Sequence, residues 1–108
     1  MWYIFPQYKG LGQSETSKYY AIQDLNEARD YLMHPILGSR LKEITNALLL
    51  VTENNANTIF GSPDDMKLKS SMTLFASVDT SDEKPFIKVL NKFFKGHFDK
   101  KTQDLIEG

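Results

Sequence analysis

The sequence of 108 residues contains no cysteine, which excludes disulfides, thiolate nucleophiles and thiolate metal sites together. It has only two histidines, His34 and His97, which form no helical pair of metal ligands. No apolar run approaches the roughly 20 residues that span a bilayer. The apolar start lacks the positive segment that opens a signal peptide. We therefore expect a cytoplasmic protein with no metal, no cofactor and no membrane partner.

The chain also lacks an excess of charge of one sign. Its formal net charge is −1, so it does not have the basic surface typical of nucleic-acid binding. Hydrophobic residues make up 41% and charged residues 25%, close to the average for globular proteins. No internal repeat is visible. We expect one domain over residues 1–108 and no nucleic-acid partner.

What is present is helical periodicity, and it predicts an all-α single compact domain of about five or six short helices. Asp24 and Glu27 form a capping box that starts one helix, which ends near His34. Pro35 suits the first turn of the next helix. The run "ALLLV" at 47–51 is apolar nearly all round, which indicates that this helix is the most buried one.

Two further helices are predicted with their ends. In "SPDD", Ser62 is the expected N-cap and Pro63 the first helical residue of a helix that continues through Phe75 or beyond. Its core-facing side is predicted from i, i+4 and i+7 spacing as Leu68, Met72 and Phe75. A later helix carries an apolar stripe and ends at Gly96, and Asp99 caps a short last helix.

The chain resembles the uncharacterised, mainly bacterial family called domain of unknown function 1810. The stretches that carry the resemblance are "MWYIFPQYKGLGQS", "YAIQDLNEARDYLMHPILGSRL" and "IFGSPDDMKLKSSMTLF". The resemblance covers essentially the whole chain and implies an all-α fold without an established activity. Members sometimes carry the label calpastatin, but calpain inhibition relies on disordered repeats, which this sequence lacks.

Members of that family usually carry a further helical segment before the stretch that matches Met1. The resemblance thus implies that an upstream helix is missing here, which would leave the apolar start "MWYIF" without part of its packing. We expect either a homodimer through this N-terminal segment or a monomer with an exposed apolar patch near Trp2, Ile4 and Phe5.

The candidate ligand-binding residues are polar side chains spread over the three matching stretches: Gln7, His34, Arg40, Lys67, Ser70 and Ser71. One hypothesis is a binding or regulatory module in which they line a cleft for a small anionic ligand. The alternative is a small hydrolase or transferase, with His34 as acid/base and Arg40 and Lys67 holding an anion. The sequence leaves open whether the protein is an enzyme.

Five of these six candidates also have a structural explanation that involves no ligand. Lys67, Ser70 and Ser71 would form the solvated side of a capped helix. His34 would bond the backbone at a turn, and Arg40 would pair with Asp65 or Glu43. These explanations predict exposed serines and paired charges.

Overall fold

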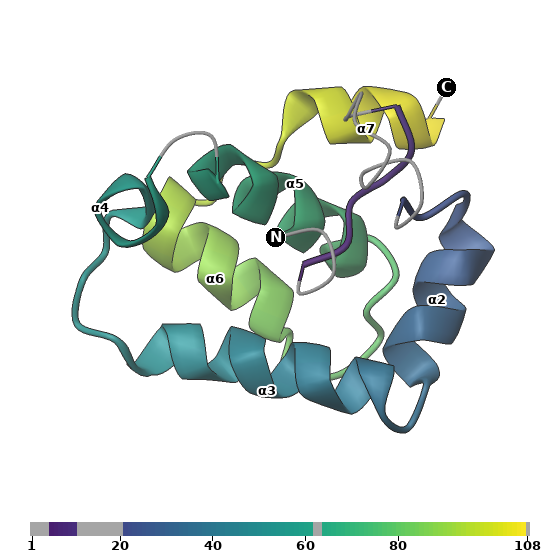
Figure 1. Cartoon of the computed structure of the whole chain (residues 1–108), viewed down its shortest axis with the longest axis horizontal. Helices are drawn as coiled ribbons and strands as arrows, with labels where there is room; N and C mark the ends of the chain where they lie inside the picture. The colour runs from purple at the N-terminus through teal and green to yellow at the C-terminus, as the bar shows by residue number, and fades with distance from the viewer. Residues whose placement is uncertain (1–4, 11–20, 62–63, 108) are drawn as a thin grey trace.

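The computed structural model describes residues 5–10, 21–61 and 64–107, and these contain six helices and no strand. The helices are α2 (Leu25–Met33), α3 (Leu37–Leu50), α4 (Ala56–Phe60), α5 (Asp64–Ala76), α6 (Pro85–Phe94) and α7 (Lys100–Glu107) (Figure 1). The predicted all-α fold with five or six short helices is confirmed. None of the described helices has the length and apolar character needed to cross a membrane.

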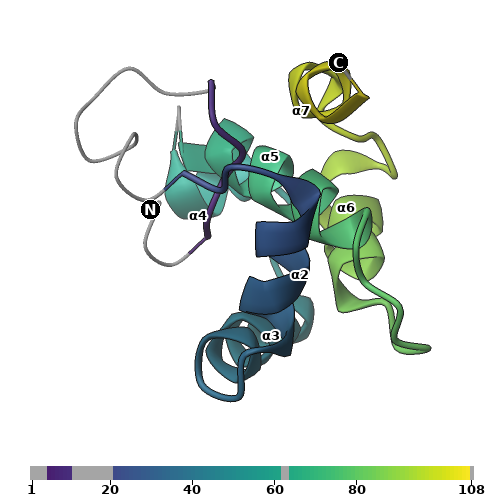
Figure 2. The same ribbon diagram turned by 90° about the vertical axis from the view of Figure 1, so that its right-hand side faces the viewer.

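Helix α5 is the centre of the fold. It packs against α2, α4, α6 and α7, and every residue from Ser70 to Phe75 is buried. Leu68, Met72 and Phe75 face the core as predicted, and all three are fully buried. Figure 2 shows α7 at one end of the molecule and α3 at the other, with α5 and α6 between them.

The prediction that the helix containing 47–51 is the most buried one is wrong. In α3 only Gly38, Leu41 and Thr45 are buried, and Leu50 is 84% exposed. The reason is that α3 packs against α2 and α6 on one side only. Apolar residues that continue around the helix therefore reach solvent.

The start of α2 and the end of α6 follow the expected capping pattern. Asp24 Oδ1 accepts the Glu27 N–H at 2.8 Å, and the Glu27 carboxylate accepts the Gln23 N–H at 3.0 Å. Gly96 follows α6 with a φ of 80°, a conformation that favours glycine. These bonds satisfy backbone groups that a helix end leaves without partners.

The start of α3 differs from the prediction. The helix begins at Leu37, so Pro35 lies in the turn before it and not in its first turn. His34 Nδ1 accepts the N–H groups of Ile36 and Leu37, both at 3.1 Å. The histidine side chain therefore bonds backbone N–H groups at the start of α3, whose N-cap residue is Ile36.

The segment 5–10 crosses α5 at an angle (Figure 1). The Ile22 N–H donates to Gln7 O at 2.8 Å, and the Lys9 N–H donates to Ile22 O at 2.9 Å. Phe5 is 3% exposed and belongs to the core, so it does not form part of an exposed apolar patch. Trp2, Ile4, Ser62 and Pro63, on which other predictions rest, lie outside the described residues.

Candidate functional site

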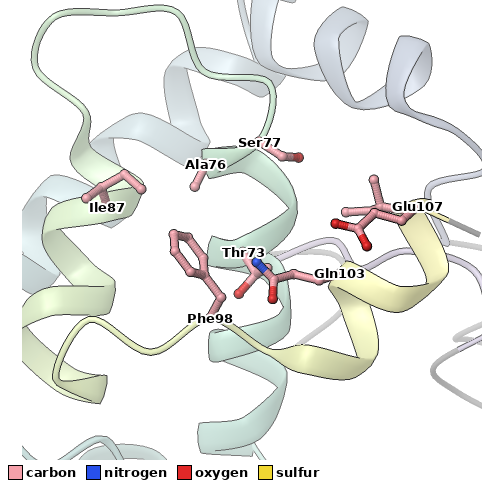
Figure 3. A pocket seen from close by; sticks show the side chains of 8 residues that line it. Thr73, Ala76, Ser77, Ile87, Phe98, Gln103 and Glu107 are labelled. Carbon is pink, nitrogen blue, oxygen red and sulfur yellow. The ribbon is translucent and has the colours of Figure 1, made fainter.

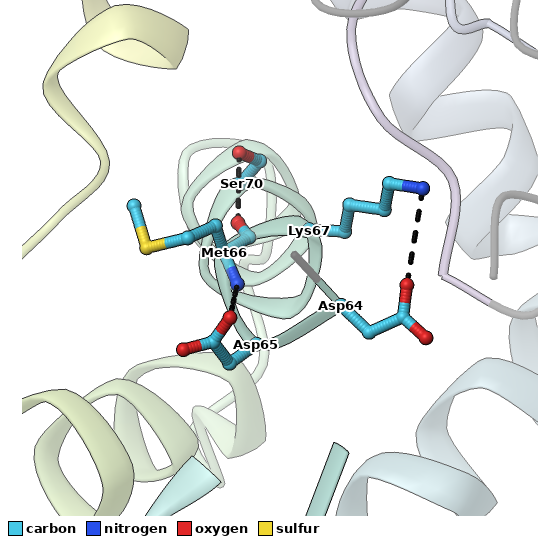
Figure 4. A network of polar contacts seen from close by, with 5 residues as sticks. All are labelled: Asp64, Asp65, Met66, Lys67 and Ser70. Atoms are coloured by element: carbon cyan, nitrogen blue, oxygen red, sulfur yellow. Dashed lines mark hydrogen bonds and ion pairs between the residues drawn. The ribbon is translucent and has the colours of Figure 1, made fainter. Parts of the chain in front are cut away.

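The six candidate side chains fall into three places, of which the first is the N-terminal half of α5. Lys67 Nζ lies 3.8 Å from Asp64 Oδ1, and both side chains are partly exposed. Figure 4 shows them on the same side of α5. Ser71 shares this side because residues i and i+4 are neighbours on a helix. This part of α5 therefore carries a cation and a hydroxyl on one side.

Gln7 and Ser71 are polar side chains that are buried although their polar atoms have no described hydrogen-bond partner. Gln7 is 2% exposed and Ser71 0%. Neither Gln7 Nε2 nor Ser71 Oγ has a hydrogen-bond partner within the part of the chain that the structure describes. Buried polar atoms nearly always find a partner, since leaving one unmet costs about 1–3 kcal/mol. We use the name donor face for Gln7, Lys67 and Ser71, of which Lys67 and Ser71 share one side of α5.

Ser70 lies in a second place, on the side of α5 that meets α7. Its Oγ lies 3.2 Å from Asp99 Oδ2 and 3.1 Å from Met66 O. The same Asp99 oxygen accepts the Thr102 N–H at 3.0 Å and the Thr102 hydroxyl at 2.6 Å, so Asp99 caps α7 as predicted. In return, the Asp99 N–H donates to Thr73 Oγ1 at 2.8 Å. This buried network fastens α7 to α5.

The interpretation of the two serines as part of a solvated helix face is therefore wrong. Serine and threonine are small enough to lie between closely packed helices, where their hydroxyls can bond the carbonyl one turn back. Ser70 does this with Met66 O, and Thr73 does it with Lys69 O at 2.8 Å. The polar character of a side chain did not reveal its burial here.

His34 and Arg40 occupy the third place, the corner between α2 and α3. Both are exposed, and His34 Nδ1 is already engaged with two backbone N–H groups. No ion pair joins Arg40 to an acid, and no hydrogen bond joins either residue to Lys67, among the residues described. In Figure 1 this corner and the start of α5 lie at different ends of the molecule.

Two cavities were not predicted from the sequence. One, of about 230 Å³, lies between α5, α6 and α7 and is lined by Thr73, Ala76, Ser77, Ile87, Phe98, Gln103, Ile106 and Glu107 (Figure 3). The other, of about 180 Å³, includes Arg29, Lys42 and Asp79 in its wall. Nothing in the spacing of these residues signals a cavity, because its walls come from elements distant in sequence.

The described residues contain no group of three or more histidine, aspartate or glutamate side chains that could hold a metal ion. Burial raises the pKa of Tyr31, which packs against Phe75 with ring centroids 5.7 Å apart. Tyr31 is thus part of the packing between α2 and α5.

Comparisons with known proteins agree on family and fold. Residues 1–106 match the family model described as "Protein of unknown function (DUF1810)". The crystal structure of the conserved hypothetical protein Rv1873 from Mycobacterium tuberculosis is similar, with 42% sequence identity and a TM-score of 0.94. That match covers 99% of this chain and 76% of the other. No curated protein matches this chain. The chain therefore belongs to the DUF1810 family, as its sequence indicates.

Proposed function

We propose that this protein is a binding module for a small anionic ligand and that the donor face is its site. The observation that carries the proposal is the pair of buried, unpartnered polar atoms, Gln7 Nε2 and Ser71 Oγ. A bound ligand is one explanation for polar atoms that the fold itself leaves without partners.

The chemistry of the donor face favours an anion. An amide nitrogen and an ammonium group can only donate hydrogen bonds, and a hydroxyl can donate one. Lys67 adds a positive charge one turn after the acids Asp64 and Asp65, at the end of α5 where the helix dipole is positive. Phosphate, sulfate and carboxylate groups match such a set of donors.

The ion pair with Asp64 does not prevent this role. Lys67 and Asp64 are 36% and 44% exposed, and ion pairs at such exposed positions are worth about 0–1 kcal/mol. An anion that also bonds Gln7 and Ser71 can therefore compete for the lysine.

Binding is better supported than catalysis. The enzymatic alternative needs His34 beside the anion holders Arg40 and Lys67, and a general base must lie within hydrogen-bond reach of the reacting atom. His34 and Arg40 belong to the α2–α3 corner, whereas Lys67 belongs to α5. A regulatory role and a cytoplasmic location stay predictions.

A thermal-shift series tests the proposal with inorganic phosphate, pyrophosphate, nucleotides and sugar phosphates as probes. A ligand at 100 times its Kd adds about 2.7 kcal/mol to the free energy of unfolding. We expect Lys67→Gln to abolish the shift and Lys88→Gln, an exposed lysine on α6, to preserve it. The proposal fails if no anion raises the melting temperature, or if Lys67→Gln responds like the wild type.

A further inference from the structure

The cavity between α5, α6 and α7 is independent of the donor face and has a different chemical character. Its walls are mainly apolar, formed by Ala76, Ile87, Phe98 and Ile106. Its volume is about 230 Å³. An apolar cavity of about 150 Å³ is enough to bind benzene in an engineered protein. This space can therefore hold an aromatic ring with a short chain attached.

The hydroxyl groups in the wall are already used by the fold. Thr73 Oγ1 donates to Lys69 O and accepts the Asp99 N–H, both at 2.8 Å. Ser77 Oγ donates to Leu74 O. Polar recognition in the cavity thus falls to the two polar side chains of α7, Gln103 and Glu107, which Figure 3 shows extending from α7 on the side of α5.

The charge in the cavity is negative. Among the described residues that line the cavity, Glu107 alone is charged, and no described lysine or arginine forms an ion pair with it. It is also the last residue of α7, where the helix dipole places partial negative charge. Across the cavity, the Phe98 ring is 41% exposed, and an aromatic face attracts a cation.

These observations point to one class of ligand. We propose that the cavity binds a small organic amine, with its apolar body against Ile87 and Phe98 and its ammonium group at Glu107. The Glu107 carboxylate and the Gln103 amide oxygen accept hydrogen bonds, and an ammonium group can donate hydrogen bonds to both. A carboxylate ligand would meet repulsion at the same position.

Phenethylamine is a suitable probe, with phenethyl alcohol and 3-phenylpropionate as neutral and anionic analogues of similar shape. Titration of the full chain, followed by two-dimensional NMR of backbone amides, gives a Kd for each and locates the shifts. We expect phenethylamine to bind at least about tenfold more tightly than either analogue, which is about 1.4 kcal/mol. The perturbed amides should be those of Thr73, Phe98 and Gln103.

Two variants and one control make the test specific. Glu107→Gln, at an exposed helix end, should remove the preference for the amine, and Glu83→Gln, an exposed acid outside the cavity, should keep it. Ala76→Leu should block all three probes by filling the cavity, with circular dichroism as the check on folding. Equal Kd values for amine and alcohol, shifts at other residues, or no saturable binding of phenethylamine would each overturn the proposal.

Discussion

Two adjacent serines on α5 differ in their hydrogen bonding, and we expect them to differ in their contribution to stability. Ser70 bonds Asp99 and Met66, whereas Ser71 is completely buried with no described partner. Ser70→Ala should lower the free energy of unfolding by about 1–2 kcal/mol, because Asp99 Oδ2 and Met66 O lose the one hydroxyl donor that they share. Ser71→Ala should leave it unchanged or raise it, because an unmet hydroxyl disappears.

Urea denaturation of the ligand-free protein checks both serine variants in one experiment. The donor-face proposal adds a second expectation, since Ser71→Ala should reduce anion binding while it preserves or increases stability. Such opposition between stability and binding is usual where a site is built from polar groups that the fold does not satisfy. Equal destabilisation by both variants would mean that Ser71 has a structural partner.

Tyr31 predicts how stability changes in alkali. Burial raises its pKa in the folded state above the ordinary value of 10.0. Its contribution is therefore fully present below pH 10.0 and is lost as pH rises through the folded-state pKa. Tyr31→Phe should remove this part of the alkaline decline in the free energy of unfolding. An unchanged slope of that free energy against pH in the variant would contradict the assignment.

At the scale of the helix, the crossing of α2 and α3 depends on Gly38. A Cβ atom at this position would lie 1.8 Å from Leu32 O, which is far inside van der Waals contact. Glycine to alanine usually stabilises a helix interior, but here we expect a loss of about 2–3 kcal/mol from overpacking. Ser39 is the next residue and is exposed, so Ser39→Ala is the control and should change the free energy of unfolding by less than about 0.5 kcal/mol. Chemical denaturation of the two variants gives the comparison.

The C-terminal end of α3 is capped from another helix. Lys92 Nζ on α6 donates to Leu48 O at 3.1 Å and Leu49 O at 3.0 Å, and it also contacts Val51 O. Lys92→Met should cost about 1–3 kcal/mol and increase amide hydrogen exchange in the last turn of α3. Lys88→Met is the matched control because Lys88 is exposed on the same helix. Equal effects of the two substitutions would show that the cap contributes nothing.

These elements also show how far the sequence predicts the fold. Capping residues such as Asp24 and Asp99 act within a few residues of the chain, so spacing alone placed them correctly. Burial depends on neighbours that are distant in sequence. Periodicity therefore predicts α3 as the most buried helix, although that helix is α5. The structure was needed to see that Gln7 and Ser71 are buried and that Phe98 and Glu107 line a cavity.

At the scale of the whole molecule, most of the large apolar side chains that are exposed among the described residues lie at the α2–α3 corner and along α3, whereas Ile59, Met66 and Phe98 lie elsewhere. Met33 is 81% exposed and Ile36 55%, and Leu37 and Ile44 are also exposed. Phe5, by contrast, is buried in the core. The molecule therefore has a second apolar surface besides the N-terminal segment that is predicted to form a homodimer. An experiment must distinguish which of the two surfaces forms an interface.

The predicted homodimer through the N-terminal segment can be tested with one variant on each surface. Burial of apolar side chains drives association, so Trp2→Ser should shift the dimer toward monomer, whereas Met33→Ser should not. Sedimentation velocity over a range of protein concentrations gives the association constant of each. The emission of Trp2, the only tryptophan, should shift to shorter wavelength as the wild type associates. A dimer weakened only by Met33→Ser would assign the interface to the α2–α3 corner. A wild-type protein that is monomeric at all concentrations, with a constant melting temperature, would refute the homodimer.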